Sequence, residues 1–162
     1  MAALTHVPRS TDAAATRQRP IGIFWDIENC QVPKGKSATA VVCCIREHIM
    51  DSYTEEEFLC VCDIRKESDD VIQELNMAQV TVVHVNATCK NAADDKLKQC
   101  MRRFVDTHGA QATVVLITGD VNFSTELFDF RYRRKVRVIL VYGLQAPEAL
   151  TVYAHQCCSY AD

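Results

Sequence analysis

The chain repeats one pattern five times: a short apolar run, followed by a segment with the spacing of an amphipathic helix. The apolar runs lie at residues 21–26, 57–64, 80–85, 112–117 and 135–141. Each has the length of a strand that is covered on both faces, as in a parallel sheet. Alternating strands and helices predict an α/β fold with a mainly parallel sheet, and right-handed crossovers place helices on both of its faces.

The segments between the apolar runs carry helix start and stop signals. We predict helices over residues 37–50, 67–77, 91–107, 122–133 and 147–156. Ser37 can cap the first helix, and Gly109 follows the third, where a glycine commonly ends a helix. Pro147 stands at the start of the last helix, where its missing N–H costs nothing.

Residues 1–19 differ from the rest of the chain. They are rich in Ala, Thr and Arg without a sustained period, which predicts a flexible leader or linker. The regular alternation begins at Pro20, so we expect residues 20–162 to form one domain. A chain of 162 residues is long enough to bury a core on both faces of a sheet.

The composition predicts a soluble cytoplasmic protein. No apolar run approaches the roughly 18 residues that a membrane span needs. The first residues also lack the continuous apolar stretch of a signal peptide. The nine cysteines are an odd number without C-x-x-C spacing, so we expect reduced core thiols rather than disulfides or a zinc site.

Charge is distributed unevenly along a chain whose formal net charge is −3. Residues 131–137 carry five positive charges in seven positions. A second basic group lies on one predicted helix: Lys96, Lys98, Arg102 and Arg103. A basic flank beside an acidic cluster suits a phosphate polymer that approaches a cation site.

Acidic side chains follow several of the predicted strands. Asp26 ends the first strand, Asp63 lies at the end of the second, and Asp120 follows the fourth. Asp94 and Asp95 open the helix after the third strand. Because ligands of open α/β sheets bind beyond the carboxyl ends of the strands, we expect these carboxylates to lie close together there.

Carboxylates that converge at one place repel one another unless a cation lies between them. Asp26 directly follows the apolar run Ile23 to Trp25, so we expect it to be partly buried, where a carboxylate needs a metal, a cation or several donors. Oxygen ligands without histidine or thiolate favour Mg²⁺ or Mn²⁺ over zinc. One metal-bound water can then serve as the nucleophile in hydrolysis of a phosphate ester.

Each acidic residue also has a purely structural interpretation. Asp94 can complement the dipole of a helix that Asn91 caps. Asp120 can be a turn residue after a glycine, and Asn122 can be an N-cap. Asp63 can be solvated. Asp26 is the hardest to explain in this way, because it closes an apolar strand.

Three motifs carry a family resemblance. They are F-W-D-I-E-N-C at 24–30, K-N-A-A-D-D-K-L at 90–97 and T-G-D-V-N-F-S at 118–124. In this order and spacing they resemble the NYN domain, a branch of the PIN-like ribonucleases, over about residues 20–160. The resemblance implies a three-layer fold with a five-stranded sheet of order 3-2-1-4-5, and metal-dependent cleavage of single-stranded RNA in mRNA turnover or silencing. It also implies that RNA-binding and LOTUS-type modules lie outside this chain.

The resemblance also assigns roles by position. It makes Asp26, Asp94 and Asp120 the ligands of Mg²⁺ or Mn²⁺. Asn29 is expected to support Asp26. Of the neighbours Asp94 and Asp95, which point about 100° apart on a helix, one faces the metal and the other supports it, and we favour Asp94 as the ligand.

Three further residues complete the predicted site. Asp63 is a candidate fourth acid, and Asn122 and Ser124 are expected to support the site. Many NYN domains carry an aspartate where this chain has Asn122. The loss of one anionic ligand implies weaker metal binding, modest activity or a preference for Mn²⁺.

We expect basic side chains to hold the RNA backbone: Lys96, Arg131, Arg133, Arg134 and Arg137. Phe123 or Tyr132 is a candidate to stack a base, although Phe123 can equally be packed inward. Two alternatives remain: an inactive module of the same fold that binds RNA or proteins, and a phosphohydrolase with Asp26 as nucleophile. The latter needs a second aspartate two residues on, where this chain has Glu28.

Overall fold

The computed structural model describes residues 19–49 and 52–160. The strands are β1 (Arg19–Trp25), β2 (Tyr53–Cys62), β3 (Thr81–His84), β4 (Thr113–Ile117), β5 (Arg137–Tyr142) and β6 (Gln156–Ser159). The helices are α2 (Ala38–Ile49), α3 (Asp69–Met77), α4 (Ala92–His108), α5 (Ser124–Phe128) and α6 (Glu148–Thr151). Short turns are η3 (Ile64–Lys66), η4 (Gly109–Gln111), η5 (Val121–Phe123) and the π-helical η6 (Asp129–Arg133).

All six strands pair in parallel, in the order β3-β2-β1-β4-β5-β6. The predicted α/β class and the order 3-2-1-4-5 are confirmed, with a sixth strand added at the edge. The chain builds outward from β1 in both directions, so the strand order reverses between β1 and β4. Ligands of such sheets bind at this reversal, beyond the carboxyl ends of the strands. We call the side of the sheet formed by these strand ends the carboxyl edge.

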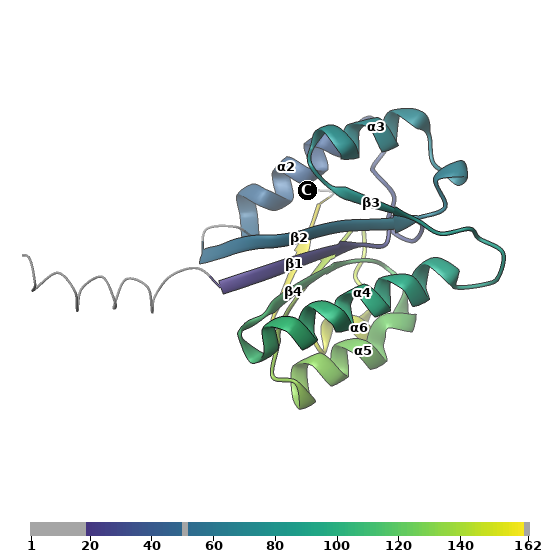
Figure 1. The fold of residues 1–162 in the computed structure, drawn as a ribbon. Coiled ribbons are helices and arrows are strands. Elements are labelled where there is room, and N and C mark those ends of the chain that lie inside the picture. The colour runs from purple at the N-terminus through teal and green to yellow at the C-terminus, as the bar shows by residue number, and fades with distance from the viewer. Residues whose placement is uncertain (1–18, 50–51, 161–162) are drawn as a thin grey trace, which may run out of the picture.

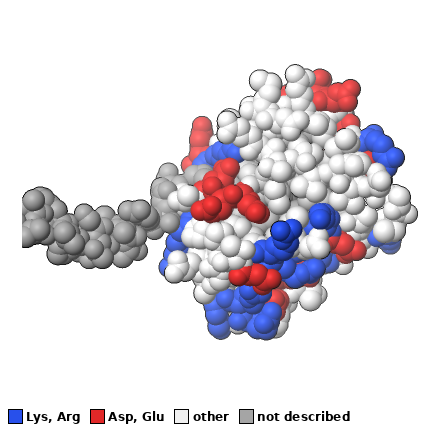
Figure 2. Space-filling model, viewed as in Figure 1, with Lys and Arg blue, Asp and Glu red and all other residues white. Residues whose placement is uncertain are grey.

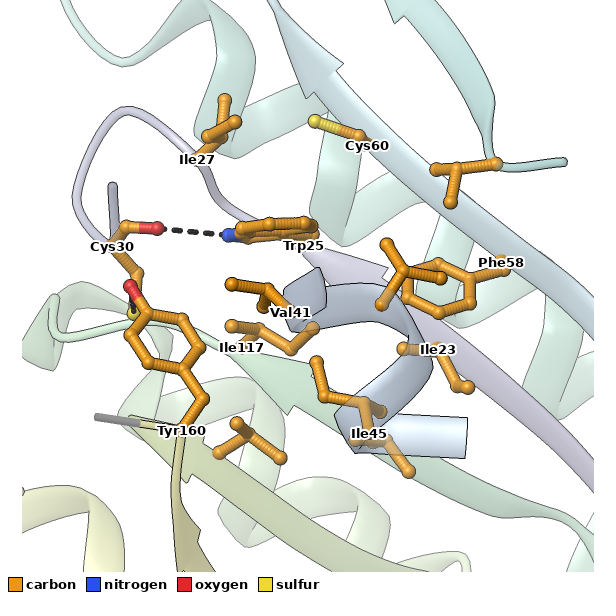
Figure 3. Close-up of a cluster of buried hydrophobic side chains, with 14 of the residues drawn as sticks. Ile23, Trp25, Ile27, Cys30, Val41, Ile45, Phe58, Cys60, Ile117 and Tyr160 are labelled. Atoms are coloured by element: carbon orange, nitrogen blue, oxygen red, sulfur yellow. Dashed lines mark hydrogen bonds between the residues drawn. The ribbon is translucent and has the colours of Figure 1, made fainter. Parts of the chain in front are cut away.

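Helices cover both faces of the sheet, with α2 and α3 on one and α4, α5 and α6 on the other (Figure 1). The side chains of β1 alternate between the two layers, as those of a strand do. Trp25 packs with Val41 and Ile45 of α2 (Figure 3). Phe24 faces α4, where its ring lies 5.7 Å from that of Phe104. Two apolar cores therefore fix β1 at the centre of the fold.

Helix boundaries largely follow the sequence signals. The Ser37 hydroxyl accepts a hydrogen bond from the Ala40 N–H at 3.0 Å and caps α2. Gly109, with a φ of 65°, ends α4. The segment predicted as one helix over 122–133 is a 3₁₀ turn, a short α-helix and a π-helical turn in succession. Within the described ranges, none of the helices has the length and apolar character needed to cross a bilayer.

The end of the chain differs from the prediction. The helix expected over 147–156 ends at Thr151, and Gln156–Ser159 instead forms β6. The exposed edge of β5 has backbone groups that need partners. The His155 N–H donates to the Val138 carbonyl at 2.8 Å, and the Val138 N–H donates to His155 Nδ1 at 3.0 Å. This pairing with β5 replaces the last turns of the expected helix.

Two other expectations concern the termini and the thiols. The predicted leader at 1–19 lies outside the described residues, except for Arg19, which begins β1. All nine cysteines are free, as expected. Cys60 and Cys62 are buried in β2, whereas Cys43 on α2 is exposed, so the thiols do not all belong to the core.

Gly22 of β1 packs against the side chains of Phe24 and Phe104. A Cβ atom at this position would lie 2.8 Å from Cε2 of Phe24 and 3.0 Å from Cδ2 of Phe104. We therefore expect Gly22→Val to lower the free energy of unfolding by about 1–3 kcal/mol, the usual effect of overpacking, as measured by urea denaturation. Gly143→Ala is the control, because its Cβ would make an ordinary 3.5 Å contact with Tyr160. Equal losses in the two variants would contradict this account of the packing.

Candidate metal centre

Three carboxylates from three elements meet at the carboxyl edge of the sheet. Asp26 follows β1, Asp94 lies in the first turn of α4, and Asp120 follows β4. One carboxylate oxygen from each residue lies within 4.8 Å of the other two. Parallel pairing of β1 with β4 continues to the Asp26 N–H, which donates to the Ile117 carbonyl at 2.9 Å. We call Asp26, Asp94 and Asp120 the acid cluster.

Asp26 is almost fully buried, with 1% of its surface exposed. Its Oδ2 accepts hydrogen bonds from the Thr118 hydroxyl at 2.7 Å and from the Asn29 amide at 2.9 Å. Burial raises the pKa of Asp26, these two hydrogen bonds lower it, and the charges of Asp120 and Glu28 raise it further. Two neutral donors therefore do not fully compensate this buried charge.

Asp94 is also buried, with 3% of its surface exposed, whereas the neighbouring Asp95 is exposed. The structure thus brings Asp94, and not Asp95, into the acid cluster. Burial raises the pKa of Asp94 to about 7, and the charges of Asp26 and Asp120 act in the same direction. A hydrogen bond from the Asn122 side chain lowers it. The metal-free cluster therefore holds a proton at a pH where a lone aspartate would not.

Polar side chains link the members of the cluster. The Asn29 amide lies 2.9 Å from Asp26 and 3.5 Å from Asp120, so it bridges two of the acids. The Asn122 N–H donates to Asp120 Oδ1 at 2.9 Å. Thr118 contributes twice, because its hydroxyl also accepts from the Asp120 N–H at 3.0 Å. Ser124 begins α5, and its side chain makes no hydrogen bond to the cluster within the described ranges.

The donor set fits a hard divalent cation. Among residues 19–49 and 52–160, no lysine or arginine forms an ion pair with Asp26, Asp94 or Asp120. The three carboxylates supply only oxygen ligands, and no histidine or thiolate joins them among these residues. Mg²⁺ and Mn²⁺ prefer such ligands. A bound cation would also remove the mutual repulsion that raises the pKa of Asp94.

Asp63 does not belong to the acid cluster. Both of its carboxylate oxygens accept hydrogen bonds from the Arg65 guanidinium, at 3.0 and 2.9 Å. The Ala87 N–H donates to the same carboxylate at 3.1 Å. The Arg65 guanidinium holds the pKa of Asp63 well below its usual range. The suggestion of a fourth acidic ligand is therefore not supported, because Arg65 already neutralises this carboxylate.

The predicted basic group at 131–137 also lies away from the acid cluster. Arg137 begins β5 and pairs in register with Thr113, the first residue of β4. It therefore lies at the amino ends of the strands, opposite the carboxyl edge. Arg134 forms an ion pair with Asp106 near the end of α4, at 2.8 Å. Helix α5 starts at the carboxyl edge and runs back along the sheet, so it carries Arg131 and Arg133 away as well (Figure 1). Figure 2 shows basic side chains gathered over α4 and over the segment after α5.

Phe123 cannot stack a base, because its side chain is fully buried. The inward-packed alternative is confirmed, with Lys98 Nζ lying 5.5 Å from the ring centroid on the outer side. Lys96 lies in the second turn of α4 and donates to Gln99 Oε1 at 3.1 Å. Tyr132 is 47% exposed but belongs to the distant group after α5.

Two hollows flank the acid cluster at the carboxyl edge. One, of about 450 Å³, is lined by Asn29 and Gly119 and has Lys34 in its wall. The other, of about 370 Å³, contains Lys66 and Lys90 beside the start of α4. Sequence reasoning missed these three lysines and Thr118. The motifs do contain Lys90 and Thr118, which stand beside Asn91 and Gly119.

The fold and the acid cluster together define the class of protein. Residues 20–160 match the NYN domain, and the chain belongs to this family, as its motifs predicted. The family is part of a nuclease superfamily.

Curated relatives of this chain carry one protein name. Meiosis regulator and mRNA stability factor 1 from Gallus gallus is 60% identical over 143 residues, and that from Mus musculus is 59% identical. The match covers 88% of this chain but only 8% of each relative. The chain is thus similar to one small part of a much longer protein.

A solved structure has the same fold. A protein of unknown function from Vibrio parahaemolyticus superposes with a TM-score of 0.67, over 88% of this chain and 93% of that one. Its sequence identity is 13%, so the likeness concerns the fold alone.

The raised pKa of Asp94 gives the metal-free protein a characteristic pH dependence. Asp94 keeps its proton up to about pH 7 when folded, but only up to about 3.8 when unfolded. The stabilisation from protonated Asp94 is complete below pH 3.8 and is lost as the pH rises through about 7. The free energy of unfolding should therefore fall across this window. We expect Asp94→Asn to show a smaller fall, measured by urea denaturation in EDTA. Mn²⁺ at pH 8 should stabilise the wild type and not this variant, whereas equal pH slopes would contradict the assignment.

Proposed function

We propose that this domain is a metal-dependent endoribonuclease that cleaves single-stranded RNA. The observation that carries the proposal is the acid cluster, in which three carboxylates from separate elements place an oxygen within 4.8 Å of one another. A structural role does not require three acids at the strand-order reversal of a parallel sheet. The proposed metal is Mg²⁺ or Mn²⁺.

Each residue of the site has a task in this proposal. Asp26, Asp94 and Asp120 would hold the metal, which would supply an activated water and stabilise charge on the phosphate. Asn29 and Thr118 fix the Asp26 carboxylate through the 2.9 and 2.7 Å hydrogen bonds. Asp94 would have to be ionised to ligate the metal, because a metal-ligating carboxylate is deprotonated.

The substrate class follows from the charges around the cluster and from the relatives. Lys34 lies in one flanking hollow, and Lys66 and Lys90 in the other, so a phosphate backbone can cross the acid cluster between them. The relatives are named as mRNA stability factors. We therefore propose RNA as the substrate, mRNA turnover in the cytoplasm as the process, and target choice by RNA-binding or LOTUS-type modules outside this chain.

One observation favours a second candidate, a weakly active or inactive module that binds RNA or protein partners. Asn122 contacts the cluster with an uncharged side chain that hydrogen-bonds Asp94. Without a further carboxylate there, the site carries less negative charge to attract a cation. Binding of RNA without cleavage at any metal concentration would favour this candidate.

Cleavage of an unstructured RNA tests the proposal directly. We expect the wild-type chain to cut it with Mg²⁺ or Mn²⁺, and EDTA to stop the reaction. Asp120→Asn should reduce the rate by roughly a hundredfold or more, since loss of a ligand exceeds the effect of losing its support. Asp95→Asn is the matched control, because Asp95 is the exposed neighbour of a cluster residue and should remain active. Activity that survives EDTA or Asp120→Asn would refute the mechanism.

Asn122→Asp tests whether the missing acid limits the site. A fourth carboxylate beside Asp94 should bind the cation more tightly, because it adds a negative charge next to the cluster. We expect a lower dissociation constant for Mn²⁺ in calorimetry and a larger gain in cleavage with Mg²⁺ than with Mn²⁺. Weaker metal binding in Asn122→Asp would show that the amide is the better neighbour for this site.

A further inference from the structure

Three aromatic side chains meet on the surface of the layer formed by α5, η6 and α6. Phe128 is 51% exposed, Tyr132 is 47% exposed, and Tyr153 is half-buried between them. Their ring centroids lie 5.2 Å (Phe128 to Tyr132), 5.7 Å (Phe128 to Tyr153) and 6.3 Å (Tyr132 to Tyr153) apart. Exposed apolar groups gathered in one patch commonly mark a binding surface.

Two arginines lie in this part of the chain, Arg131 beside the rings and Arg137 at the start of β5. Arg131 lies over the Tyr132 ring at 5.5 Å, and the Arg137 guanidinium donates to Gln156 Oε1 at 3.5 Å. Neither forms an ion pair with a carboxylate in the part of the chain that the structure describes. Burial lowers the pKa of His155, and the charges of Arg131 and Arg137 lower it further, so both arginines lie near this side chain.

The other two arginines of this run differ. Arg133 is paired with Asp129, and Arg134 is paired with Asp106. The Arg137 Nε is buried and makes no hydrogen bond within residues 19–49 and 52–160. A buried donor without a partner costs free energy. The surface therefore combines exposed ring faces with positive charge that the protein itself leaves unpaired.

This surface is separate from the acid cluster. Tyr132 follows Phe123 by nine residues, which is roughly 13 Å along a helix. Arg137 stands at the amino end of β5, one strand length from the carboxyl edge. Because α4 and α5 lie side by side on this face (Figure 1), one extended RNA strand can contact both the acid cluster and this aromatic surface.

We propose that Phe128, Tyr132, Tyr153, Arg131 and Arg137, which we call the aromatic–arginine platform, form a second docking surface for single-stranded RNA. Aromatic faces that stack bases, combined with cations that hold phosphates, are what proteins use to bind single strands without sequence preference. The unpaired arginines favour a polyanion over a protein partner. This inference rests on the proposed function in taking RNA as the substrate, and it adds a place that holds the strand away from the cut.

Binding without cleavage tests the platform. The probe is fluorescein-labelled polyuridine, with the 162-residue chain in EDTA, and the readout is anisotropy. We expect Tyr132→Ala to weaken binding about fivefold to a hundredfold, as loss of one stacked base does, and Tyr132→Phe to bind like the wild type. Arg131→Gln should weaken binding and reduce its salt dependence.

Two matched controls lie elsewhere on the molecule. Met77→Ala removes an apolar side chain that is 76% exposed on α3, across the sheet. Cys43→Ser changes an exposed side chain on α2, which lies on the same far face. Neither should change RNA affinity, and all variants should melt at the wild-type temperature. Unchanged RNA affinity in Tyr132→Ala would overturn the proposal. A change in oligomeric state without a change in RNA affinity would also overturn it, because this face would then be a contact between copies of the chain.

A cleavage arm separates this inference from the proposed function. With Mn²⁺, Tyr132→Ala should raise KM for polyuridine and leave cleavage of a dinucleotide unchanged, since a dinucleotide is too short to reach the platform. If the wild type cuts no RNA but Tyr132→Ala binds RNA more weakly than the wild type, the platform stands and the nuclease proposal fails. If cleavage is normal and Tyr132→Ala changes neither affinity nor KM, the platform fails and the nuclease proposal stands.

Discussion

The buried carboxylate of Asp26 is the constraint around which the carboxyl edge is arranged. Parallel pairing of β1 with β4 places Asp26 beside Thr118 and Asp120, and the crossover from β3 brings the start of α4 to the same point. The Thr118 hydroxyl and the Asn29 amide satisfy its oxygen but carry no charge. Asp94 and Asp120 add further negative charge. A divalent cation between the three carboxylates would balance their charge, and the proposed nuclease chemistry depends on it.

The same constraint extends to the far end of the chain. Asn29 lies in the loop after β1, and Tyr160 holds that loop from the end of β6. The Tyr160 hydroxyl donates to the Gln31 carbonyl and accepts from the Cys30 thiol at 3.2 Å. The Trp25 indole donates to the Cys30 carbonyl at 2.8 Å (Figure 3). The sixth strand therefore does more than cover an edge, because it supports the residue that bridges Asp26 and Asp120.

Sequence patterns predicted the parts of the molecule that depend on local apolar runs. Strands β1 to β5 are of this kind, because buried parallel strands have few alternatives. Their order was implied by the resemblance to the NYN domain and not by the apolar runs. The convergence of Asp26, Asp94 and Asp120 also follows, since strand ends meet at one edge. β6 was missed because its pairing depends on the unsatisfied edge of β5, which local periodicity does not reveal.

Other misses have the same cause. Asp63 ends a strand like the other acids, but Arg65, two residues further on, neutralises it. Arg131 and Arg137 share a basic run, but the direction of α5 carries that run to the opposite end of the sheet from the acids. Thr118 was passed over because a threonine at a strand end is unremarkable until its hydroxyl is seen 2.7 Å from Asp26. The roles of these residues depend on which side chains lie next to them in space.

If Asp26, Asp94 and Asp120 share one divalent cation, the ion can be located by anomalous diffraction from a crystal of this domain soaked in Mn²⁺. We expect a manganese peak bounded by carboxylate oxygens of these three residues, with Asp63 still paired with Arg65 and Asp95 facing solvent. A crystal saturated with Mn²⁺ that shows no peak between the three carboxylates, or a peak at Asp63 or Asp95 instead, would contradict this expectation.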